Sequence, residues 1–430
     1  MRSFKDILLA LILTVLFLPK IQEAFEPVRP GKLTGAYIKA PSPHLTWKSW
    51  KKGWYQDSLG VHVNDSLPLR PYLVRINNQV DYSLFRILHG EEVVLGKRSN
   101  LFLMEYIKGY LGIGYPSKQF ISDKAMKCKK VQEFLWNEKH IFFLVVMAPD
   151  KATYMPEDIP DRFLAMGGNG WGRDYLAEQL RANGVHVIDF MPVFSQMKDT
   201  SKYPLFVKTG IHWTDYGSFI AADSMFKYIT AKSGYRFPGM TMDRIEVTKN
   251  PRHDDADVDR LLNLALPTST TKYAYPVITY ETDTDLRKPA ALFVGDSFYW
   301  GLFNQGIIQN MFSNLEFWFY DNLIFPESFS GNKSAKSVDL LETVYRQNII
   351  VLLYVEGGWG NPGTGFVDRV FMAIDTSTNN EIRAIEKAIL ENPKWYELVK
   401  SKAEAENVPV ASKVRSEAIY MYNQRIIHHK

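Results

Sequence analysis

The middle of the chain alternates short apolar runs with segments whose apolar residues recur at helical spacing. Strands without polar alternation, separated by helices, are typical of a parallel sheet that is covered on both faces. The pattern therefore predicts an α/β domain with a central parallel sheet. The predicted strands are 141–148, 185–190, 291–295, 315–320 and 349–355, and the predicted helices are 123–138, 174–183, 215–233 and 337–347.

The segments that flank this region have other patterns. Residues 25–54 are punctuated by proline and glycine, which predicts an arm without a core of its own. Apolar residues at helical spacing over Leu69–Leu88 predict a helix that packs on the main domain, and Val93–Phe102 predicts a hairpin. Residues 380–424 are charged and helix-favouring. We expect four parts: a signal segment (1–24), an arm with helix and hairpin (25–122), the main domain (123–375) and a small helical appendage (376–430).

The N-terminus carries the order of charges and apolar residues that is typical of an export signal. Arg2 and Lys5 precede the uninterrupted apolar stretch Ile7–Leu18. This stretch is shorter than the ~20 residues that span a bilayer comfortably, which favours a secretory signal, but an uncleaved anchor and a buried core helix remain alternatives. We expect the rest of the chain to lie in the periplasm or on the outer face of the inner membrane.

Charge and cysteine content exclude several classes of function. The 430 residues include 51 basic and 47 acidic side chains, a net charge of +4 without a concentrated basic field, so we expect no nucleic-acid partner. The one cysteine, Cys128, lies in a lysine-rich run that predicts an exposed helix surface. The acidic run 253–259 lacks the glycine and closing glutamate of a calcium loop and predicts a solvated helix start. We expect no metal and no cofactor.

A candidate nucleophile follows one of the predicted strands. The run 291–294 leads into Gly295-Asp296-Ser297, and a helix is predicted from Tyr299. A serine at this position lies near a helix N-terminus, whose N–H groups can stabilise a developing oxyanion. Gly295 allows the sharp turn. The alternative interpretation is that Asp296 and Ser297 only cap the helix.

A candidate base lies upstream of this serine. His212 and Trp213 precede a predicted helix start within the α/β region, where the imidazole can point at the same sheet edge. A hydrogen-bonded loop histidine beside a packed tryptophan is the alternative. The pairing of His212 with Gly-Asp-Ser makes the catalytic interpretation more specific.

Taken together, these residues resemble the AlgX/AlgJ-type SGNH hydrolase-like family of exported polysaccharide O-acetyltransferases. The resemblance extends from about Gly53 to Gly360 and includes the His-Trp-Thr segment and Gly-Asp-Ser-Phe. Further matching pieces are Leu69-Arg70, Tyr82–Phe85, Gly96-Lys97, Leu101-Phe102 and Ala148–Thr153 followed by Pro156.

This resemblance implies a three-layer SGNH-hydrolase-like fold in which the histidine precedes the serine, a permuted order relative to ordinary SGNH hydrolases. It implies that Ser297 is the nucleophile and His212 the general base. An acetyl-serine would form and pass its acetyl group to a sugar hydroxyl, whereas transfer to water would make the protein an acetyl esterase. The resemblance also implies a polysaccharide substrate and a membrane-bound O-acyltransferase that supplies acetyl groups.

The position where the family places an aspartate is Gly210 in this chain. An aspartate that orients the catalytic histidine is worth about 10⁴ in rate in a well-studied protease. A backbone carbonyl or another carboxylate, with Asp215 and Asp189 as candidates, could take that role. Alternatively, a Ser-His dyad could act slowly, or the protein could bind glycans without turning them over. For sugar contacts we expect Trp213, Tyr299, Trp359 and Asn361.

Overall fold

A computed structural model describes residues 4–25, 31–35, 39–168, 171–281, 285–355, 365–406 and 408–428. The chain divides into two compact units. The first contains residues 1–104, 208–211 and 254–271, and the second contains residues 105–207, 212–253 and 272–430. The four-part division at residues 24, 122 and 375 remains a prediction.

The second unit contains the predicted sheet. Its six strands have the order β4-β3-β10-β7-β8-β9, in which all neighbours are parallel except the β8–β9 pair. The strands are β3 (Phe142–Ala148), β4 (Val187–Asp189), β7 (Ala291–Gly295), β8 (Glu316–Phe319), β9 (Leu323–Phe325) and β10 (Ile349–Val355). Every residue of β3, β7 and β10 is buried, which explains why their sequences lack polar alternation. The predicted α/β fold is confirmed.

Helices cover both faces of this sheet. On one face, α6 (Lys118–Lys139), α9 (Trp171–Ala182) and α16 (Phe366–Ile374) share a core with alternate residues of β3 and β10. On the other face, Val146 of β3 lies among residues of α10 (Phe190–Met197) and α11 (Asp215–Ser233). The result is a three-layer arrangement whose middle layer is almost entirely apolar.

Cys128 lies on the buried side of α6, and the expectation of an exposed surface is wrong. Its side chain is fully buried, and burial raises the pKa of its thiol to about 12. Two lysines of the same run, Lys124 and Lys127, lie 2.5 Å and 2.7 Å from the carboxylate of Asp368 on α16. The lysine-rich run therefore faces a neighbouring helix over part of its length.

Shorter helices and a second strand pair complete the second unit. An antiparallel pair, β5 (Met240–Thr248) with β6 (Tyr273–Tyr280), was not predicted from the sequence. The helices are α5 (Met104–Tyr110), α7 (Lys151–Tyr154), α8 (Asp161–Leu164), α13 (Tyr299–Phe303), α14 (Ile307–Met311) and α15 (Leu340–Tyr345). Of these, α13 and α15 fall where helices were predicted.

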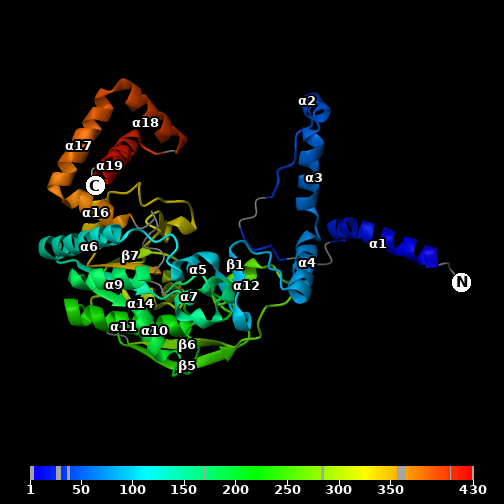
Figure 1. Cartoon of the computed structure of the whole chain (residues 1–430), viewed down its shortest axis with the longest axis horizontal. Coiled ribbons are helices and arrows are strands. Elements are labelled where there is room, and N and C mark those ends of the chain that lie inside the picture. Colours follow the sequence, from blue (N-terminus) through cyan, green and yellow to red (C-terminus); the bar gives the residue numbers. More distant parts are fainter. Residues whose placement is uncertain are drawn as a thin grey trace. The chain divides into compact units, whose positions relative to one another are not determined.

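The C-terminal helices form the predicted appendage. They are α17 (Thr376–Glu391), α18 (Pro393–Ala405) and α19 (Val410–His428), and they lie side by side in orange to red in Figure 1. Asn392 caps α18, whose first residue is Pro393, a position where the missing N–H costs no helical hydrogen bond. Buried residues such as Ile385, Val399 and Ala418 give these helices their own small core.

The first unit contains helices and a short hairpin. Its helices are α1 (Phe4–Phe25), α2 (Trp47–Lys51), α3 (Trp54–Ser66), α4 (Arg70–Phe85) and α12 (Asp257–Leu261), and its hairpin pairs β1 (Val93–Leu95) with β2 (Leu101–Leu103). The helix and hairpin predicted over residues 69–102 are confirmed. The apolar residues that predicted α4, however, are exposed: Leu73, Ile76, Val80 and Leu84. Among the described helices, none is long and apolar enough to cross a membrane.

Candidate active site

The turn that follows β7 depends on a glycine. Gly295 pairs with Leu353 of β10 on one side and with Phe319 of β8 on the other. A Cβ atom at Gly295 would lie 2.0 Å from the carbonyl oxygen of Leu353, so no other residue fits without moving the strand. Ser297 follows two residues later and is half-buried at the carboxyl edge of the sheet, where open α/β sheets bind their ligands.

The carboxylate of Asp296 braces this turn. The carboxylate accepts hydrogen bonds from the N–H of Phe298 at 3.0 Å and from the N–H of Val355 at 2.5 Å, and Asp296 is buried. Burial raises the pKa of Asp296 to about 6, although the two N–H groups and the charge of His212 oppose the shift. Asp296 thus ties the turn to the end of β10 and places a carboxyl group near the His212 imidazole.

His212 and Ser297 come together although 85 residues separate them. The Nε2 atom of His212 lies 2.6 Å from Oγ of Ser297, and the imidazole ring lies 4.9 Å from the ring of Phe298. The indole N–H of Trp213 donates to the carbonyl oxygen of Phe298 at 3.2 Å. This hydroxyl–imidazole contact is the arrangement in which a histidine can remove the proton of a serine nucleophile.

The backbone beside His212 is fixed by the N-cap of α11. The hydroxyl of Thr214 accepts a hydrogen bond from the N–H of Gly217 and donates one to the carbonyl oxygen of Pro204 at 2.8 Å. The N–H of Thr214 donates to the carbonyl oxygen of Leu205 at 2.9 Å. Hydrogen bonds of Thr214 thus tie the loop that carries the imidazole both to residues 204–205 and to the first turn of α11.

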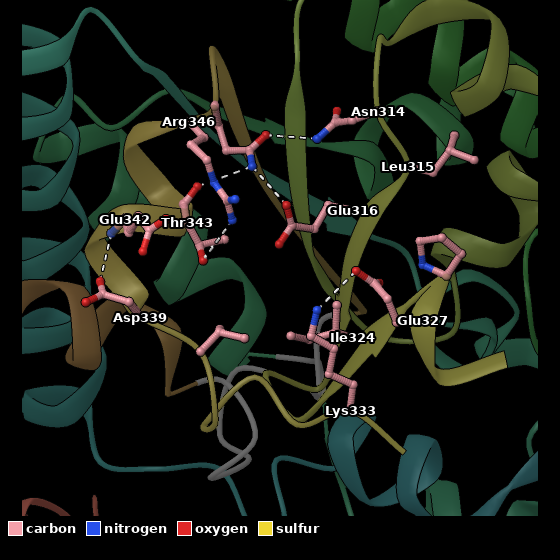
Figure 2. A pocket seen from close by; sticks show the side chains of 13 residues that line it. Asn314, Leu315, Glu316, Ile324, Glu327, Lys333, Asp339, Glu342, Thr343 and Arg346 are labelled. Carbon is pink, nitrogen blue, oxygen red and sulfur yellow. Dashed lines mark hydrogen bonds and ion pairs between the residues drawn. The ribbon is translucent and has the colours of Figure 1, made fainter. Parts of the chain in front are cut away.

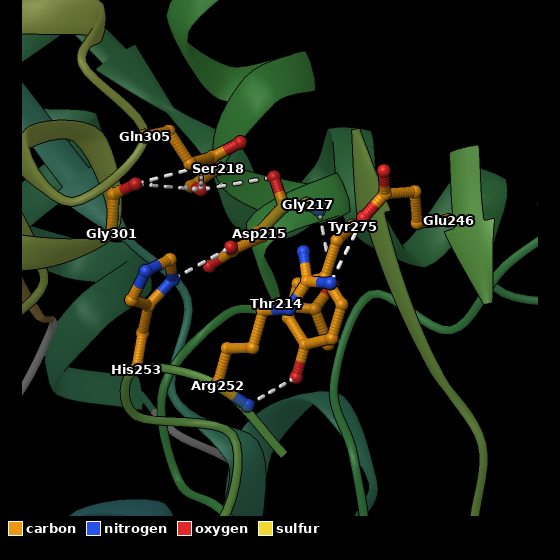
Figure 3. Close-up of polar contacts among 10 residues, drawn as sticks. All are labelled: Thr214, Asp215, Gly217, Ser218, Glu246, Arg252, His253, Tyr275, Gly301 and Gln305. Carbon is orange, nitrogen blue, oxygen red and sulfur yellow. Dashed lines mark hydrogen bonds and ion pairs between the residues drawn. The ribbon is translucent and has the colours of Figure 1, made fainter. Parts of the chain in front are cut away.

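Further bonds join α11 to the helix that follows Ser297, as Figure 3 shows. The hydroxyl of Ser218 donates to the carbonyl oxygen of Gly301 at 3.3 Å and accepts from the amide of Gln305 at 2.6 Å. At the start of α11, Asp215 Oδ2 lies 2.8 Å from Nδ1 of His253. The elements that carry the imidazole and the hydroxyl are thus held to each other, which preserves the short contact between them.

One amide in the turn is available to an oxyanion. The N–H of Asp296 donates to Leu353, the N–H of Phe298 to the side chain of Asp296, and the N–H of Tyr299 to the carbonyl oxygen of Asp296. The N–H of Ser297 makes no hydrogen bond to any part of the chain that the structure describes. It can therefore donate to a negatively charged oxygen that develops beside Oγ.

Tyr320 brings a phenol to the same place. It follows β8, and its N–H donates to the carbonyl oxygen of Gly295 at 2.7 Å, with the backbone in the left-handed region at a φ of 52°. Burial and the charge of Asp296 raise the pKa of Tyr320 to about 12, and a hydrogen bond with the side chain of Ser297 opposes the shift. The phenol is neutral at ordinary pH and can donate a hydrogen bond beside the serine.

The sequence that forms this site matches a known family. Residues 93–299, which include both His212 and Ser297, match the model described as "SGNH hydrolase-like domain, acetyltransferase AlgX". This stretch of the chain is similar to the AlgX acetyltransferase family. The resemblance inferred from the sequence motifs is thereby confirmed over these residues.

The solved structures that are similar to this chain have low sequence identity to it. The O-acetyltransferase domain of Pseudomonas putida AlgJ is 15% identical with a TM-score of 0.43, and the match covers 65% of this chain and 99% of that one. Pseudomonas aeruginosa AlgX is 13% identical with a TM-score of 0.42, covering 64% and 67%. Bacillus cereus PatB1 is 13% identical with a TM-score of 0.37, covering 57% and 92%. No curated protein matches the sequence.

The two aspartates considered as substitutes for the missing family acid are bonded to other side chains. Asp189 caps α10 and forms ion pairs with Arg173 at 3.0 Å and Arg181 at 3.2 Å. Asp215 lies against His253, as described above. Neither contact involves His212, so their proposed role as orienting acids gains no support from these bonds.

The position of the family aspartate is closed to a side chain. A Cβ atom at Gly210 would lie 2.9 Å from the carbonyl oxygen of Asp254, 3.1 Å from that of Asp255 and 3.1 Å from Oδ1 of Asp257. That carboxylate accepts hydrogen bonds from the N–H of Ile211 at 3.2 Å, directly before His212, and of Val258 at 2.7 Å. The acidic run 253–259, predicted as a solvated helix start, does include the first residues of α12, but Asp255 is buried, so the run is only partly solvated.

Two of the residues expected to contact sugar are buried in the core of the second unit, which corrects the prediction. Trp213 is buried against Phe298, and its indole N–H is bonded as described above. Tyr299 is buried with its ring stacked 3.8 Å from that of Phe317. Trp359 and Asn361 lie outside the described residues.

A separate cavity of about 610 Å³ lies at the opposite end of the sheet (Figure 2). It is lined by Asn314 before β8, by Glu316 at the start of β8 and by Arg346 after α15, whereas Ser297 follows the carboxyl end of β7. Glu316 accepts hydrogen bonds from the side chains of Trp318 at 3.1 Å and Gln347 at 3.0 Å, and burial raises its pKa. The cavity includes neither His212 nor Ser297 and is not part of the candidate active site.

Proposed function

We propose that this protein is an exported O-acetyltransferase that acetylates a cell-envelope or secreted polysaccharide through an acetyl-Ser297 intermediate. The observation that carries the proposal is the 2.6 Å contact between His212 Nε2 and Ser297 Oγ, within the stretch 93–299 that matches the AlgX acetyltransferase model. A serine alone is a weak nucleophile, and an adjacent imidazole is the usual means of activating it.

In the first step, His212 accepts the proton of Ser297 while Oγ forms a bond to the carbonyl carbon of an acetyl donor. The tetrahedral oxyanion accepts hydrogen bonds from the N–H of Ser297 and the phenol of Tyr320. The donor's oxygen leaves with the proton that His212 had taken. The negative charge of Asp296 stabilises the imidazolium of His212 that forms in this step. The same attraction lowers the pKa of Asp296 and so opposes the effect of burial.

In the second step, a sugar hydroxyl replaces the donor. His212 removes its proton, the sugar oxygen bonds to the acetyl carbon, and the bond to Ser297 Oγ breaks and the serine regains its proton. Attack by water instead would release acetate, which is the esterase alternative. The chemistry uses only groups of this chain and the two substrates.

The cellular setting is part of the same proposal. Positive charges before the apolar stretch Ile7–Leu18 support export, and the segment would either be cleaved or stay as an anchor. We place the protein in the periplasm or on the outer face of the inner membrane. A membrane-bound O-acyltransferase would supply the acetyl group, as the family resemblance implies.

An assay with p-nitrophenyl acetate as donor tests this function. The wild-type protein should release p-nitrophenol and acetylate oligosaccharides from a panel of mannuronic acid, glucose and N-acetylglucosamine oligomers, read by mass spectrometry. Ser297→Ala should lower the rate at least about 10³-fold, because it removes the nucleophile. Ser313→Ala, an exposed serine on the same unit, is the matched control. Equal rates for wild type and Ser297→Ala would refute the proposal.

A catalytically impaired glycan-binding protein is the second candidate, and Gly210 is the observation that favours it. This candidate predicts that oligosaccharides bind to the wild type and to Ser297→Ala with the same affinity in calorimetry, and that neither protein forms acetylated sugar. Acetylated sugar from the wild type would contradict it, and acetate release without acetylated sugar would identify an esterase.

A further inference from the structure

A short segment of the first unit combines tryptophan and lysine without any acidic residue. Residues 46–56 read Thr-Trp-Lys-Ser-Trp-Lys-Lys-Gly-Trp-Tyr-Gln and contain three tryptophans, one tyrosine and three lysines. This stretch of eleven residues carries a charge of +3, whereas the whole chain of 430 residues carries +4. The three lysines lie within the largest cluster of aromatic residues in the N-terminal arm. We call residues 46–56 the Trp-Lys segment.

The Trp-Lys segment has a defined backbone. A capping box between Thr46 and Ser49 starts α2, with N–H to hydroxyl distances of 3.0 Å in both directions. Gly53, with a φ of 79°, turns the chain into α3. The side-chain amide of Gln56 donates to the carbonyl oxygen of Trp50 at 3.2 Å, and the rings of Trp50 and Tyr55 lie 6.0 Å apart. The aromatic and basic side chains are thus presented on a local scaffold.

The side chains of this scaffold face outward. Trp47, Trp50 and Trp54 are 80%, 50% and 54% exposed, and neither α2 nor α3 has a buried residue. Exposure of three tryptophans is unusual, since large aromatic residues are normally at least partly covered. The lysines Lys48, Lys51 and Lys52 are exposed as well, and none of them forms an ion pair with the described part of the chain.

We propose that the Trp-Lys segment binds the headgroup region of an anionic lipid bilayer. Tryptophan is enriched at the boundary between headgroups and acyl chains because its ring is apolar and its N–H is polar. Lysine extends its charge toward lipid phosphates while its stem stays in the apolar zone. A protein interface would instead be depleted of lysine, so the combination favours a membrane over a protein partner.

The lysines of the Trp-Lys segment have a measurable effect on membrane binding. Three lysines near an anionic surface contribute about 1 kcal/mol each, which corresponds to roughly a 100-fold stronger partitioning into anionic than into zwitterionic vesicles. Salt should weaken this difference, because it screens the lysine charges. The binding is independent of the acetyl-transfer proposal, since no residue of the Trp-Lys segment belongs to the candidate active site.

A fluorescent label gives a local test that is not affected by the apolar helix α1. Ser58 is exposed on α3, one turn after Trp54 and on the same face of the helix, and the native Cys128 is fully buried. The full chain with Ser58→Cys, labelled with the environment-sensitive dye NBD, is mixed with vesicles of phosphatidylcholine with or without phosphatidylglycerol. Ser401→Cys on α18, which is also exposed and lies between Lys400 and Lys402, is the matched control.

We expect a blue shift of the NBD emission at Ser58→Cys with phosphatidylglycerol vesicles and no shift at Ser401→Cys. Replacing Lys48, Lys51 and Lys52 by glutamate should lower the apparent partition coefficient at least about 100-fold, while hydrolysis of p-nitrophenyl acetate stays unchanged. An unshifted Ser58 label on protein that co-sediments with vesicles would overturn the proposal, as would equal shifts at both positions. Glutamate variants that bind like the parent protein would also overturn it.

Discussion

A side chain at Gly210 should destabilise the protein and should not restore the family's triad. The methyl group of Gly210→Ala would place Cβ 2.9 Å from one backbone carbonyl oxygen and 3.1 Å from another, and neither oxygen can turn away as the end of a side chain can. Overpacking of this kind costs typically about 1–3 kcal/mol. Gly210→Asp adds a carboxylate near that of Asp257, where two charges about 4 Å apart repel by up to roughly 4 kcal/mol at an effective dielectric constant of 20.

Urea unfolding, followed by circular dichroism, measures these effects. We expect the free energy of unfolding to fall by about 1–3 kcal/mol for Gly210→Ala and by more for Gly210→Asp. In the Asp257→Ala background the cost of Gly210→Asp should shrink, because both the contact with Oδ1 and the repulsion are removed. We expect neither variant to raise the rate of p-nitrophenyl acetate hydrolysis. Wild-type stability of Gly210→Ala, or a stable Gly210→Asp with a rate increase of about tenfold or more, would refute the reasoning.

Three further residues give predictions. Tyr320→Phe should lower the acetyl-transfer rate by about 10–100-fold at unchanged stability, because it removes one donor beside Ser297, and an unchanged rate would exclude the phenol from the oxyanion site. Trp213→Ala should cost about 3–5 kcal/mol of unfolding free energy, whereas Trp213→Phe should cost far less, and equal losses would contradict the core placement. Burial raises the pKa of Asp296 from 3.8 to about 6, so the carboxyl group binds its proton more tightly in the folded than in the unfolded protein. The contribution of this proton to the free energy of unfolding is therefore full below pH 3.8 and is lost as the pH rises through 6. Asp296→Asn should therefore flatten the decline of unfolding free energy between about pH 4 and pH 6, and a slope like that of the wild type would argue against a buried, protonated Asp296.

The central sheet could be predicted because its strands are buried on both faces. Runs such as Phe142–Ala148 and Ile349–Val355 have no polar alternation, and their packing between two helical layers is the physical reason. The pairing of His212 with Ser297 could be predicted from their places, one before a helix start and the other just after a strand. The pair β5–β6 was missed because the partners are separated by the long segment 249–272, so their pairing leaves no local signal.

The direction in which a side chain faces was harder to predict than the element that carries it. Trp213 was expected to contact sugar, but a tryptophan beside a catalytic histidine can equally well pack into the core. The sequence does not distinguish the two orientations, whereas the contact with Phe298 shows that Trp213 faces the core. Cys128 lies among lysines, but its side chain packs in the core with residues of the sheet, and Lys124 and Lys127 pair with Asp368. The oxygens around Gly210 come from residues 254–257, more than forty positions away, so the sequence could show only that an acid is missing there.

Detection of the acetyl group on Ser297 would test the central claim most directly. The wild-type protein is mixed with p-nitrophenyl acetate, quenched with acid within the first turnover, digested and analysed by tandem mass spectrometry. We predict that the peptide containing Ser297 gains the mass of one acetyl group in the wild type, that it gains none in Ser297→Ala, and that added acceptor oligosaccharide shortens its lifetime. An acetylated peptide elsewhere in the chain, or none at all while p-nitrophenol is released, would contradict the account.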